Sequence, residues 1–428
     1  MKVLIKKGRI IDPINELDMV GDILIEDGRI KEVGENIEAF QAKVIQAEGC
    51  IVSPGLLDMH VHLREPGYEA QEDIESGTAA AASGGFTKVA CMPNTDPPVD
   101  NAAVVRAILS RAHQVGSCGV LPIGCISKGQ KGKELAEIGF MVEAGIVAIS
   151  DDGKPVADSS LMRKAMQYAK AFDIPVISHC EDPSLSSGGV VNEGLISTEL
   201  GLRGIPGAAE EIMVTRDIIL AELTGARLHI AHVSTAGSVR LIREAKQRGV
   251  KVTCEAAPHH FTLTEEWVKD YDTNTKVNPP LRTIKDVEAL IEGLADGTID
   301  VIASDHAPHT VEAKSLEYDN APFGISGLET MVPLVVSGLI DKGILSWTEA
   351  LKKLTKAPAD ILKVPLSGIA KGSRADITVI DPNNSRIVDP ASFKSKGKNT
   401  PFKGMELKGW PVLTICGGKI THSIFSDN

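Results

Sequence analysis

Residues 51–67, IVSPGLLDMHVHLREPG, place two histidines one residue apart, directly after an apolar run that a Pro-Gly turn introduces. His60 and His62 stand two positions apart on a predicted strand, so both imidazoles face the same side. Two neutral imidazoles that face one point make half of a site for a divalent metal ion. His-x-His alone indicates such a site weakly, because a buried pair satisfied by hydrogen bonds gives the same pattern.

A regular alternation of short apolar strands and longer helical patterns continues from about Pro54 onward. The predicted strands are 56–60, 86–94, 118–127, 145–152, 174–180, 227–234, 250–258 and 300–308, and helical patterns between them include 72–85, 101–116, 159–172, 208–225 and 236–249. Several of these helical patterns end in glycine, as helices often do. The alternation therefore predicts an α/β fold, a (β/α)8 barrel of the TIM type.

Polar side chains of the kinds that bind metals follow the predicted strands one after another. The fifth strand ends in His179, the sixth in His232 and the eighth in Asp305, while Asp151 and Asp152 end the fourth. In barrels of this type the carboxyl ends of the strands carry the chemistry. We therefore expect these groups to converge with the two histidines of the first strand, which favours a metal site over a buried pair of histidines.

The two ends of the chain share a different sequence pattern, in which short alternating strands are separated by Asp-Pro, Asp-Gly and Glu-Gly turns. Neither end is long enough to form an independent core. We expect residues 1–53 and 365–428 to pair into one small β-sandwich domain, with residues 54–364 forming the barrel.

Composition and charge exclude several classes of protein. The net charge of −12 argues against a nucleic-acid partner, since such binding needs a basic surface. The seven cysteines contain no Cys-x-x-Cys pair, which is typical of small core residues in a reducing compartment. The N-terminus shows no signal-peptide pattern, and the most apolar segment is too short to span a membrane. We expect a soluble, cytoplasmic protein without a nucleic-acid or membrane partner.

The quoted motifs together resemble those of class I dihydroorotases, within the superfamily of metal-dependent amidohydrolases. The resemblance extends over essentially the whole chain and is carried by the motifs SPGLLDMHVHLREPG, CMPNTDPP, SDDG, HCED, HVST, VNPPLR, SDHAPH, APFGISGLET and KGSRADITVID. It implies a distorted barrel flanked by a β-sandwich. It also implies the reversible interconversion of N-carbamoyl-L-aspartate and L-dihydroorotate, a step of pyrimidine biosynthesis.

The resemblance implies two zinc ions per subunit, bridged by Asp152 and hydroxide. His60 and His62 would bind the first zinc together with Asp305, and His179 and His232 would bind the second. Many relatives use a carboxylated lysine as the bridge, whereas the bacterial class I enzymes use an aspartate. The spacing back from His179 favours Asp152 over Asp151, and Lys154 is the less favoured candidate for a modified bridge.

Opening or closing a cyclic amide requires an activated water, a polarised carbonyl and a proton for the leaving nitrogen. By analogy, Asp305 takes the proton of the nucleophile and delivers it to the ring nitrogen during hydrolysis. Arg64 is suited to hold the substrate carboxylate, because a guanidinium donates two parallel hydrogen bonds. The substrate-binding residues implied by the resemblance are His62, Arg64, Asn94, Asn278, His309, Phe323 and Gly324. The polar segment 310–322 is expected to be either an active-site lid or an ordinary surface loop.

Two alternatives remain at this stage. A hydantoinase or allantoinase would share His-x-His but would carry a carboxylated lysine on the fourth strand. A non-catalytic homologue that serves as a partner of aspartate transcarbamoylase would have lost metal ligands, whereas every ligand position is filled here. We expect a homodimer that acts on a small molecule, and the sequence also allows a complex with aspartate transcarbamoylase.

Overall fold

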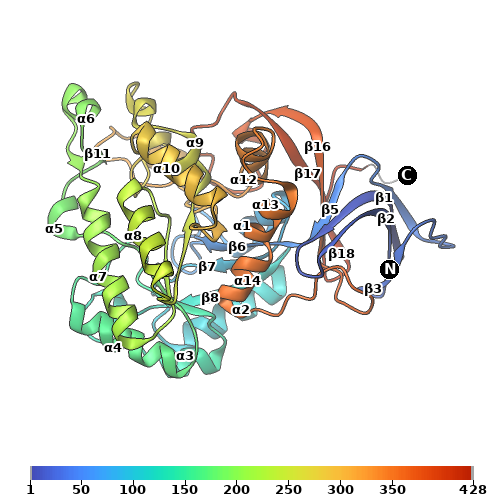
Figure 1. Ribbon diagram of the computed structural model, residues 1–428, viewed down its shortest axis with the longest axis horizontal. Helices are drawn as coiled ribbons and strands as arrows, with labels where there is room; N and C mark the ends of the chain where they lie inside the picture. The colour runs from blue at the N-terminus through green and yellow to red at the C-terminus, as the bar shows by residue number, and fades with distance from the viewer. Residues whose placement is uncertain (1, 426–428) are drawn as a thin grey trace.

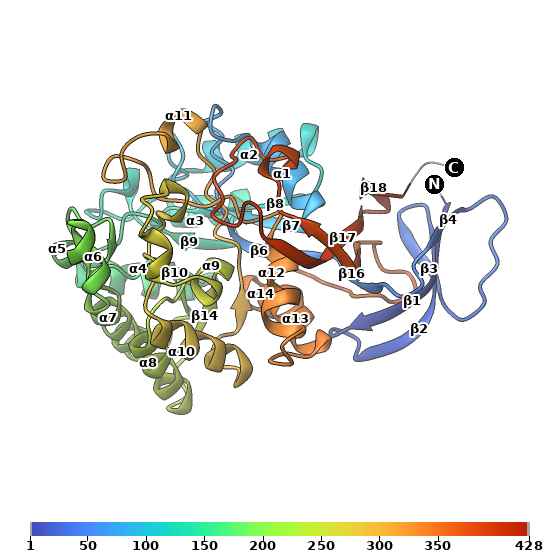
Figure 2. The same ribbon diagram turned by 90° about the horizontal axis from the view of Figure 1, so that it is seen from above.

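The structure, a computed structural model, describes residues 2–425 of the chain. Met1 and residues 426–428, which belong to the predicted terminal segments, lie outside the described residues. A barrel ringed by helices occupies one end of the molecule, and a smaller body of strands occupies the other (Figures 1 and 2). Both chain ends lie in the smaller body, as expected from their shared strand pattern.

The barrel is a parallel sheet of eight strands in the order β15-β14-β13-β10-β9-β8-β7-β6, which confirms the predicted fold class. Its strands are β6 (Leu56–Val61), β7 (Phe86–Cys91), β8 (Gly119–Gly124), β9 (Ala148–Ser150), β10 (Val176–Ser178), β13 (Leu228–Ile230), β14 (Val252–Ala256) and β15 (Val301–Ile302). Most of their side chains are buried on both faces of the sheet, because helices cover the outside.

Helices connect successive strands, and their ends follow local sequence signals. They are α1 (Ile74–Ser83), α2 (Ala102–Val115), α3 (Ile138–Ala144), α4 (Ser159–Ala171), α5 (Pro183–Ser186), α6 (Leu195–Leu200), α7 (Ala208–Thr224), α8 (Ala236–Gln247), α9 (Pro258–Thr262), α10 (Ile284–Ala295), α11 (Val311–Lys314), α12 (Met331–Val335), α13 (Trp347–Leu354) and α14 (Lys356–Leu362). Asp73 caps α1 by accepting from the Ser76 amide, and Thr283 with Asp286 forms a capping box on α10. Gly225 ends α7 in the left-handed conformation, with φ of 67°.

The barrel closes between its first strand, β6, and the chain that follows its last strand, β15. Val61 and His306 form an isolated parallel bridge, and the amide of His62 donates to the carbonyl of His306 over 2.8 Å. The amide of Ser304 lies 3.2 Å from both carboxylate oxygens of the buried Asp58. Burial raises the pKa of Asp58 to about 7. These few contacts bring the carboxyl ends of β6 and β15 side by side.

The terminal segments come together beside the barrel, as predicted, and their strands join into one hydrogen-bonded sheet. Its strands follow the order β18-β17-β16-β5-β1-β2-β3, and β4 pairs with β1. They are β1 (Lys2–Asp12), β2 (Leu17–Glu26), β3 (Arg29–Gly34), β4 (Lys43–Gln46), β5 (Ile51–Pro54), β16 (Ile377–Ile387), β17 (Glu406–Cys416) and β18 (Lys419–Ser423). The join between the two chain ends is the antiparallel pair β5 and β16, and an apolar cluster from both ends forms the core of this domain.

Several strands are shorter than the sequence suggested. The apolar pattern at 300–308 yields only β15, because the chain leaves the sheet where the polar site residues begin. The connection from β10 to α7 also contains two short strands that the sequence did not reveal, β11 (Val191–Asn192) and β12 (Gly204–Ile205). Segment 310–322, which shows no helical apolar stripe, nevertheless begins with α11, whose amides Thr310 caps.

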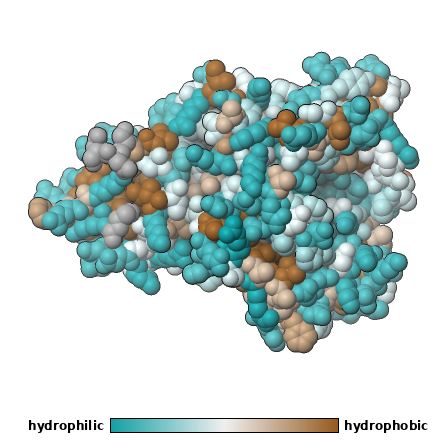
Figure 3. Space-filling view, turned by 180° about the vertical axis from the view of Figure 1, so that it is seen from behind, coloured by the Kyte–Doolittle hydropathy of each residue, from teal (hydrophilic) through white to brown (hydrophobic). Residues whose placement is uncertain are grey.

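The molecular surface seen in Figure 3 is mainly hydrophilic, with small and separate apolar patches. Within residues 2–425, no helix is both long enough and apolar enough to cross a membrane.

Candidate metal centre

Four histidines and two carboxylates meet at the carboxyl ends of the barrel strands. Asp305 Oδ1 lies 3.4 Å from Nε2 of His60 and 3.4 Å from Nε2 of His62. Asp152 Oδ1 lies 3.5 Å from His60 Nε2, 3.7 Å from His179 Nδ1 and 3.8 Å from His232 Nε2. All six side chains are buried. The structure therefore brings together every residue that the sequence analysis named as a metal ligand.

Nδ1 of His179 and Nε2 of His232 lie 2.9 Å apart, at hydrogen-bond distance. The separations between the histidines and the two carboxylates, 3.4–3.8 Å, fit ligands of a metal ion better than they fit hydrogen bonds. Zinc binds nitrogen and oxygen at about 2.0–2.2 Å, which separates tetrahedral ligand atoms by about 3.3–3.6 Å. Two triads, one of His60, His62 and Asp305 and one of His60, Asp152 and His232, have ligand atoms close enough to share an ion. Among the described residues, the buried atoms His60 Nε2 and Asp152 Oδ1 have no hydrogen-bond partner. The arrangement can therefore hold a divalent cation.

The two neighbouring aspartates at the end of β9 face different surroundings. The Asp151 carboxylate accepts from the amides of Ile126 (2.8 Å) and Ser127 (3.1 Å), and also from the Ser127 hydroxyl. These bonds tie it to the chain that follows β8. Lys154, the other alternative, is exposed. Asp152 is thus the member of this group that points into the cluster.

Both carboxylates of the cluster are held in their charged form. Burial alone would raise the pKa of Asp152, but the positive charge of His60 and the polar contacts with the rings of His232 and His60 hold it well below its usual range. The pKa of Asp305 is lowered in the same way, by His60 and by a hydrogen bond from His62, against the effect of burial. Two buried carboxylates that stay negatively charged among the imidazole rings attract a cation strongly.

Glu255 is a buried residue of this site that the sequence analysis did not identify. It lies on β14, and its Oε1 accepts from His60 Nδ1 over 2.5 Å while its Oε2 lies 3.2 Å from His229 Nε2. The hydrogen bond from Nδ1 of His60 to Glu255 orients the ring so that Nε2 faces Asp152 and Asp305, and with a cation bound there Nε2 would present its lone pair to the ion. A charged residue inside the apolar strand pattern 250–258 is the one signal that could have indicated it.

Replacing Glu255 by leucine is expected to weaken metal binding by about 10- to 100-fold, because the His60 ring loses the partner that orients it. The affinity can be measured by competition with a chelator. Glu255→Gln is the matched control, since its amide oxygen can still accept from His60 Nδ1 and should preserve most of the affinity. An unchanged affinity in the leucine variant would show that Glu255 does not orient His60.

A cavity of about 330 Å³ lies above the cluster. Of the residues expected to bind substrate, it is lined by His62, Arg64, Asn94, Asn278, Phe323 and Gly324. His309 lies behind its wall, with Nε2 2.8 Å from the carbonyl of Phe323 and 3.3 Å from Nη2 of Arg64. A larger hollow of about 610 Å³ lies beside α2 and the terminal sheet, and it contains none of the expected site residues.

Asn94 and Arg64 link the cavity wall to the metal cluster. Asn94 Oδ1 accepts from His62 Nδ1 over 2.9 Å, and its Nδ2 donates to Asp152 Oδ2 over 3.3 Å. The Arg64 guanidinium donates from Nε to the carbonyl of Pro308 over 3.3 Å. Burial lowers the pKa of Arg64 to about 10, so the group is a cation at neutral pH.

Three residues of the metal cluster and its cavity have backbone conformations that residues other than glycine rarely adopt. The φ values are 61° for Arg64, 30° for His232 and 47° for Asp305. Such conformations cost about 1–3 kcal/mol each and persist where the surroundings enforce them. The site thus carries part of the backbone strain of the chain, and other non-glycine residues with positive φ, such as Lys7 and Tyr271, lie outside it.

Two buried lysines hold segment 310–322 against the chain before it. Lys314 Nζ donates to the carbonyls of Thr273 and Pro322, at 2.9 and 2.8 Å. Lys276 Nζ lies 4.7 Å from the centre of the Phe323 ring. Burial lowers the pKa of Lys314 to about 7. These contacts fix the end of the segment beside the cavity, and its role as a lid stays a prediction.

Comparison with known proteins adds independent information. A family model described as dihydro-orotase-like matches residues 49–238. The chain is 59% identical to the dihydroorotase of Pelotomaculum thermopropionicum over 420 residues, which cover 98% of each chain. It is 55% identical to the dihydroorotase of Acetivibrio thermocellus, again over 98% of each chain. Among solved structures, the L-hydantoinase of Arthrobacter aurescens is similar with a TM-score of 0.88 and 26% identity, covering 99% of this chain and 96% of that one.

Proposed function

This chain belongs to the dihydroorotase family and is therefore a hydrolase that acts on a cyclic amide, and we propose that it is zinc-dependent and interconverts N-carbamoyl-L-aspartate and L-dihydroorotate in pyrimidine biosynthesis. The observation that carries the proposal is the convergence of four histidines and two aspartates below a cavity that Arg64 lines. Dihydroorotase relatives over nearly the full chain support this substrate, whereas the hydantoinase similarity is much lower in identity.

The residues of the cluster suit a pair of zinc ions. His60, His62 and Asp305 would hold the first ion, His179 and His232 would hold the second, and Asp152 would be a ligand shared by both. Nitrogen and carboxylate donors of this kind are those that zinc prefers at catalytic sites. When bound, the ions would lower the pKa of water from about 16 towards 7 and polarise the amide carbonyl.

Asp305 is the group that we assign to proton transfer. Because it is ionised, its carboxylate has a free position for the proton of the attacking water, and it lines the cavity where the ring would lie. During hydrolysis it then donates that proton to the ring nitrogen as the carbon–nitrogen bond breaks. During cyclisation the same carboxylate removes the proton from the carbamoyl nitrogen.

The cavity wall provides groups for the rest of the substrate. Arg64 would grip the substrate carboxylate through two parallel hydrogen bonds, with Asn94 and His309 beside it. Asn278 and Phe323 would contact the ring. Gly324 would allow close approach of its backbone, since its φ is 143° and an added Cβ would lie 2.6 Å from the carbonyl of Ala307.

The proposal is tested by measuring metal content and hydrolysis of dihydroorotate, hydantoin and allantoin on the same protein sample. We expect close to two zinc ions per chain and turnover of dihydroorotate alone. Removal of the metal by a chelator should abolish turnover, and zinc should restore it. Good hydrolysis of hydantoin or allantoin without turnover of dihydroorotate would refute the substrate assignment. Absence of zinc with no rescue by added metal would support a non-catalytic homologue.

We further propose that the protein is a cytoplasmic homodimer whose site residues belong to a barrel of residues 54–364, flanked by a β-sandwich of residues 1–53 and 365–428. Ile212, Ile219 and Leu223 support self-association, because they expose 50%, 57% and 67% of their surface along one helix, α7. Mass photometry of the chain alone and with aspartate transcarbamoylase distinguishes a dimer from a monomer and tests for a mixed complex.

A further inference from the structure

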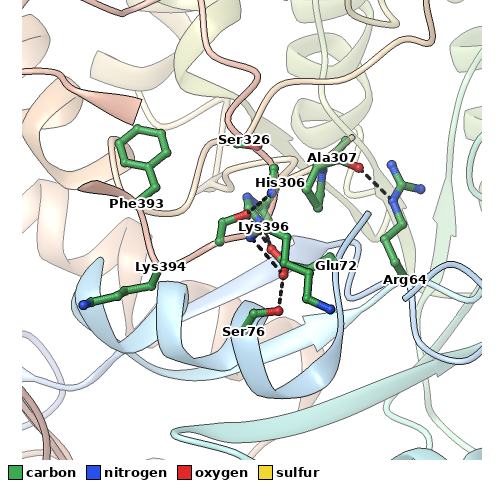
Figure 4. Close-up of polar contacts among 12 residues, drawn as sticks. Arg64, Glu72, Ser76, His306, Ala307, Ser326, Phe393, Lys394 and Lys396 are labelled. Carbon is green, nitrogen blue, oxygen red and sulfur yellow. Dashed lines mark hydrogen bonds and ion pairs between the residues drawn. The ribbon is translucent and has the colours of Figure 1, made fainter. Parts of the chain in front are cut away.

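Between β16 and β17 the chain leaves the terminal sheet and lies against the loops that follow β15. We call residues 394–399 of this excursion the strap. Figure 4 shows Lys396 beside His306, the residue that follows Asp305, with Phe393 and Lys394 farther from it. The strap is thus a part of the C-terminal segment that reaches the rim of the barrel.

The first anchor of the strap is the carboxylate of Glu72, which is fully buried. It accepts from the Ser395 hydroxyl and from the Lys396 amide, the latter over 3.3 Å. It also accepts from Nε2 of His306 over 3.4 Å and from the Ser76 hydroxyl of α1 (Figure 4). Glu72 therefore joins the strap to the residue next to Asp305.

The second anchor is the side chain of Asn399, which is 3% exposed and uses its full hydrogen-bonding capacity. Its Oδ1 accepts from the His309 amide and from the Ser326 hydroxyl, each over 2.9 Å. Its Nδ2 donates to the carbonyls of Ala307 (3.0 Å) and Gly324 (2.9 Å). One amide group thus connects the chain after β15 with the chain around Gly324.

These two stretches of chain form the side of the cavity that we assign to the substrate. Ala307, Phe323 and Gly324 line it, and His309 lies directly behind, whereas Asn399 does not reach the cavity. Only a side chain with two acceptor and two donor positions at this spacing can satisfy all four partners at once.

We propose that Asn399 is a positioning residue for the reaction: it sets the distance between the His309 and Gly324 stretches and thereby shapes the substrate side of the cavity. The proposal rests on the proposed function, because it uses the substrate contacts assigned there. It assigns no chemistry to Asn399 itself. We therefore expect a larger effect on substrate affinity than on metal binding, because none of the four groups that bond to the Asn399 side chain belongs to a proposed metal ligand.

The test compares Asn399→Asp and Asn399→Ala with the wild type as full-length, zinc-loaded proteins. In the aspartate variant a carboxylate would face two carbonyl oxygens, and in the alanine variant all four bonds are lost. We expect KM for dihydroorotate to rise about tenfold or more, kcat to fall less, and zinc content to stay at the wild-type value. Amide hydrogen exchange at His309, whose N–H donates to Asn399, should become faster.

Asn192→Asp is the matched control. Asn192 is also buried, at 6% exposure, and bonds to Arg282 over 2.8 Å and to Glu265 over 2.6 Å, in a part of the chain that we do not assign to the site. We expect it to lower the melting temperature without changing KM. Ser326→Ala removes one of the four bonds to Asn399 and should raise KM by a smaller factor, so it serves if the Asn399 variants fail to fold.

An unchanged KM and unchanged exchange at His309 in folded Asn399 variants would overturn the proposal, as would an unchanged KM in Ser326→Ala. An equal rise of KM in Asn192→Asp would also overturn it, because the effect would then reflect general loss of stability. A wild-type enzyme without dihydroorotate turnover would instead refute the proposed function, and the exchange measurement would still decide whether Asn399 holds the two stretches together.

Discussion

Replacing Asp305 by asparagine is expected to lower turnover of dihydroorotate by about three orders of magnitude or more, while much of the fold is retained. An amide cannot accept a proton at neutral pH, and general acid–base catalysis alone contributes about 10²- to 10⁴-fold. The substitution also removes a negative charge that lies 3.4 Å from both His60 and His62, which weakens the metal centre. The measurements are steady-state rates in both directions, zinc content and the circular dichroism spectrum.

Asp182→Asn is a suitable control for this variant. Asp182 follows His179 in the chain, but it is only half-buried, and its carboxylate caps the short helix α5 by accepting from the Ser184 amide over 2.9 Å. Its replacement should leave turnover near the wild-type value. Loss of turnover in Asp305→Asn with zinc retained supports the proton-transfer role, and loss of both supports the ligand role as well. Near wild-type turnover would remove Asp305 from the mechanism.

Asp152→Asn is expected to reduce zinc content and to lower turnover by about three orders of magnitude or more, since Asp152 is the residue that we propose as the bridge between the two ions. Its Oδ1 faces His60, His179 and His232 within 3.8 Å. A neutral amide at this position offers one weaker oxygen donor and no negative charge to balance the cations. Metal analysis and rate measurements on the same sample provide the test.

Asp151→Asn should behave in the opposite way. It changes a carboxylate that accepts from two backbone amides and a hydroxyl at the end of β8, so the melting temperature should fall while zinc is retained. The two neighbouring substitutions therefore separate a metal effect from a stability effect. Loss of zinc in Asp151→Asn with full zinc in Asp152→Asn would show that the two roles are exchanged.

The strands and the groups at their ends could be predicted from the sequence because both depend on local patterns. Alternation of apolar runs and helical segments fixes which residues end a parallel strand, and the carboxyl ends of all strands meet at one face. His60, His179 and Asp305 could be brought together on this basis alone. The pairing of the two chain ends followed in the same way, since neither end can bury its apolar side chains by itself.

Residues that contact the site from distant parts of the chain show no recognisable pattern in the sequence. Glu255 bonds to His60, which is 195 positions away, and Asn399 bonds to the amide of His309, which is 90 positions away. No periodicity relates such partners, because their contact depends on how separate loops pack in three dimensions. The strap was missed for the same reason: residues 394–399 were assigned to the terminal domain by their position in the chain alone.

The way in which the barrel closes has a consequence for its stability. Within residues 2–425, β6 and the chain after β15 share a single ladder bridge, so this junction is a seam with little backbone pairing. The side chains of His60, His62 and Asp305 project from the two sides of that seam. A cation bound by all three side chains would link the two sides of the seam. Part of its binding free energy would then add to the free energy of folding. The resistance of the barrel to unfolding should then rise with free metal concentration, and the metal-free chain should fray first along the seam.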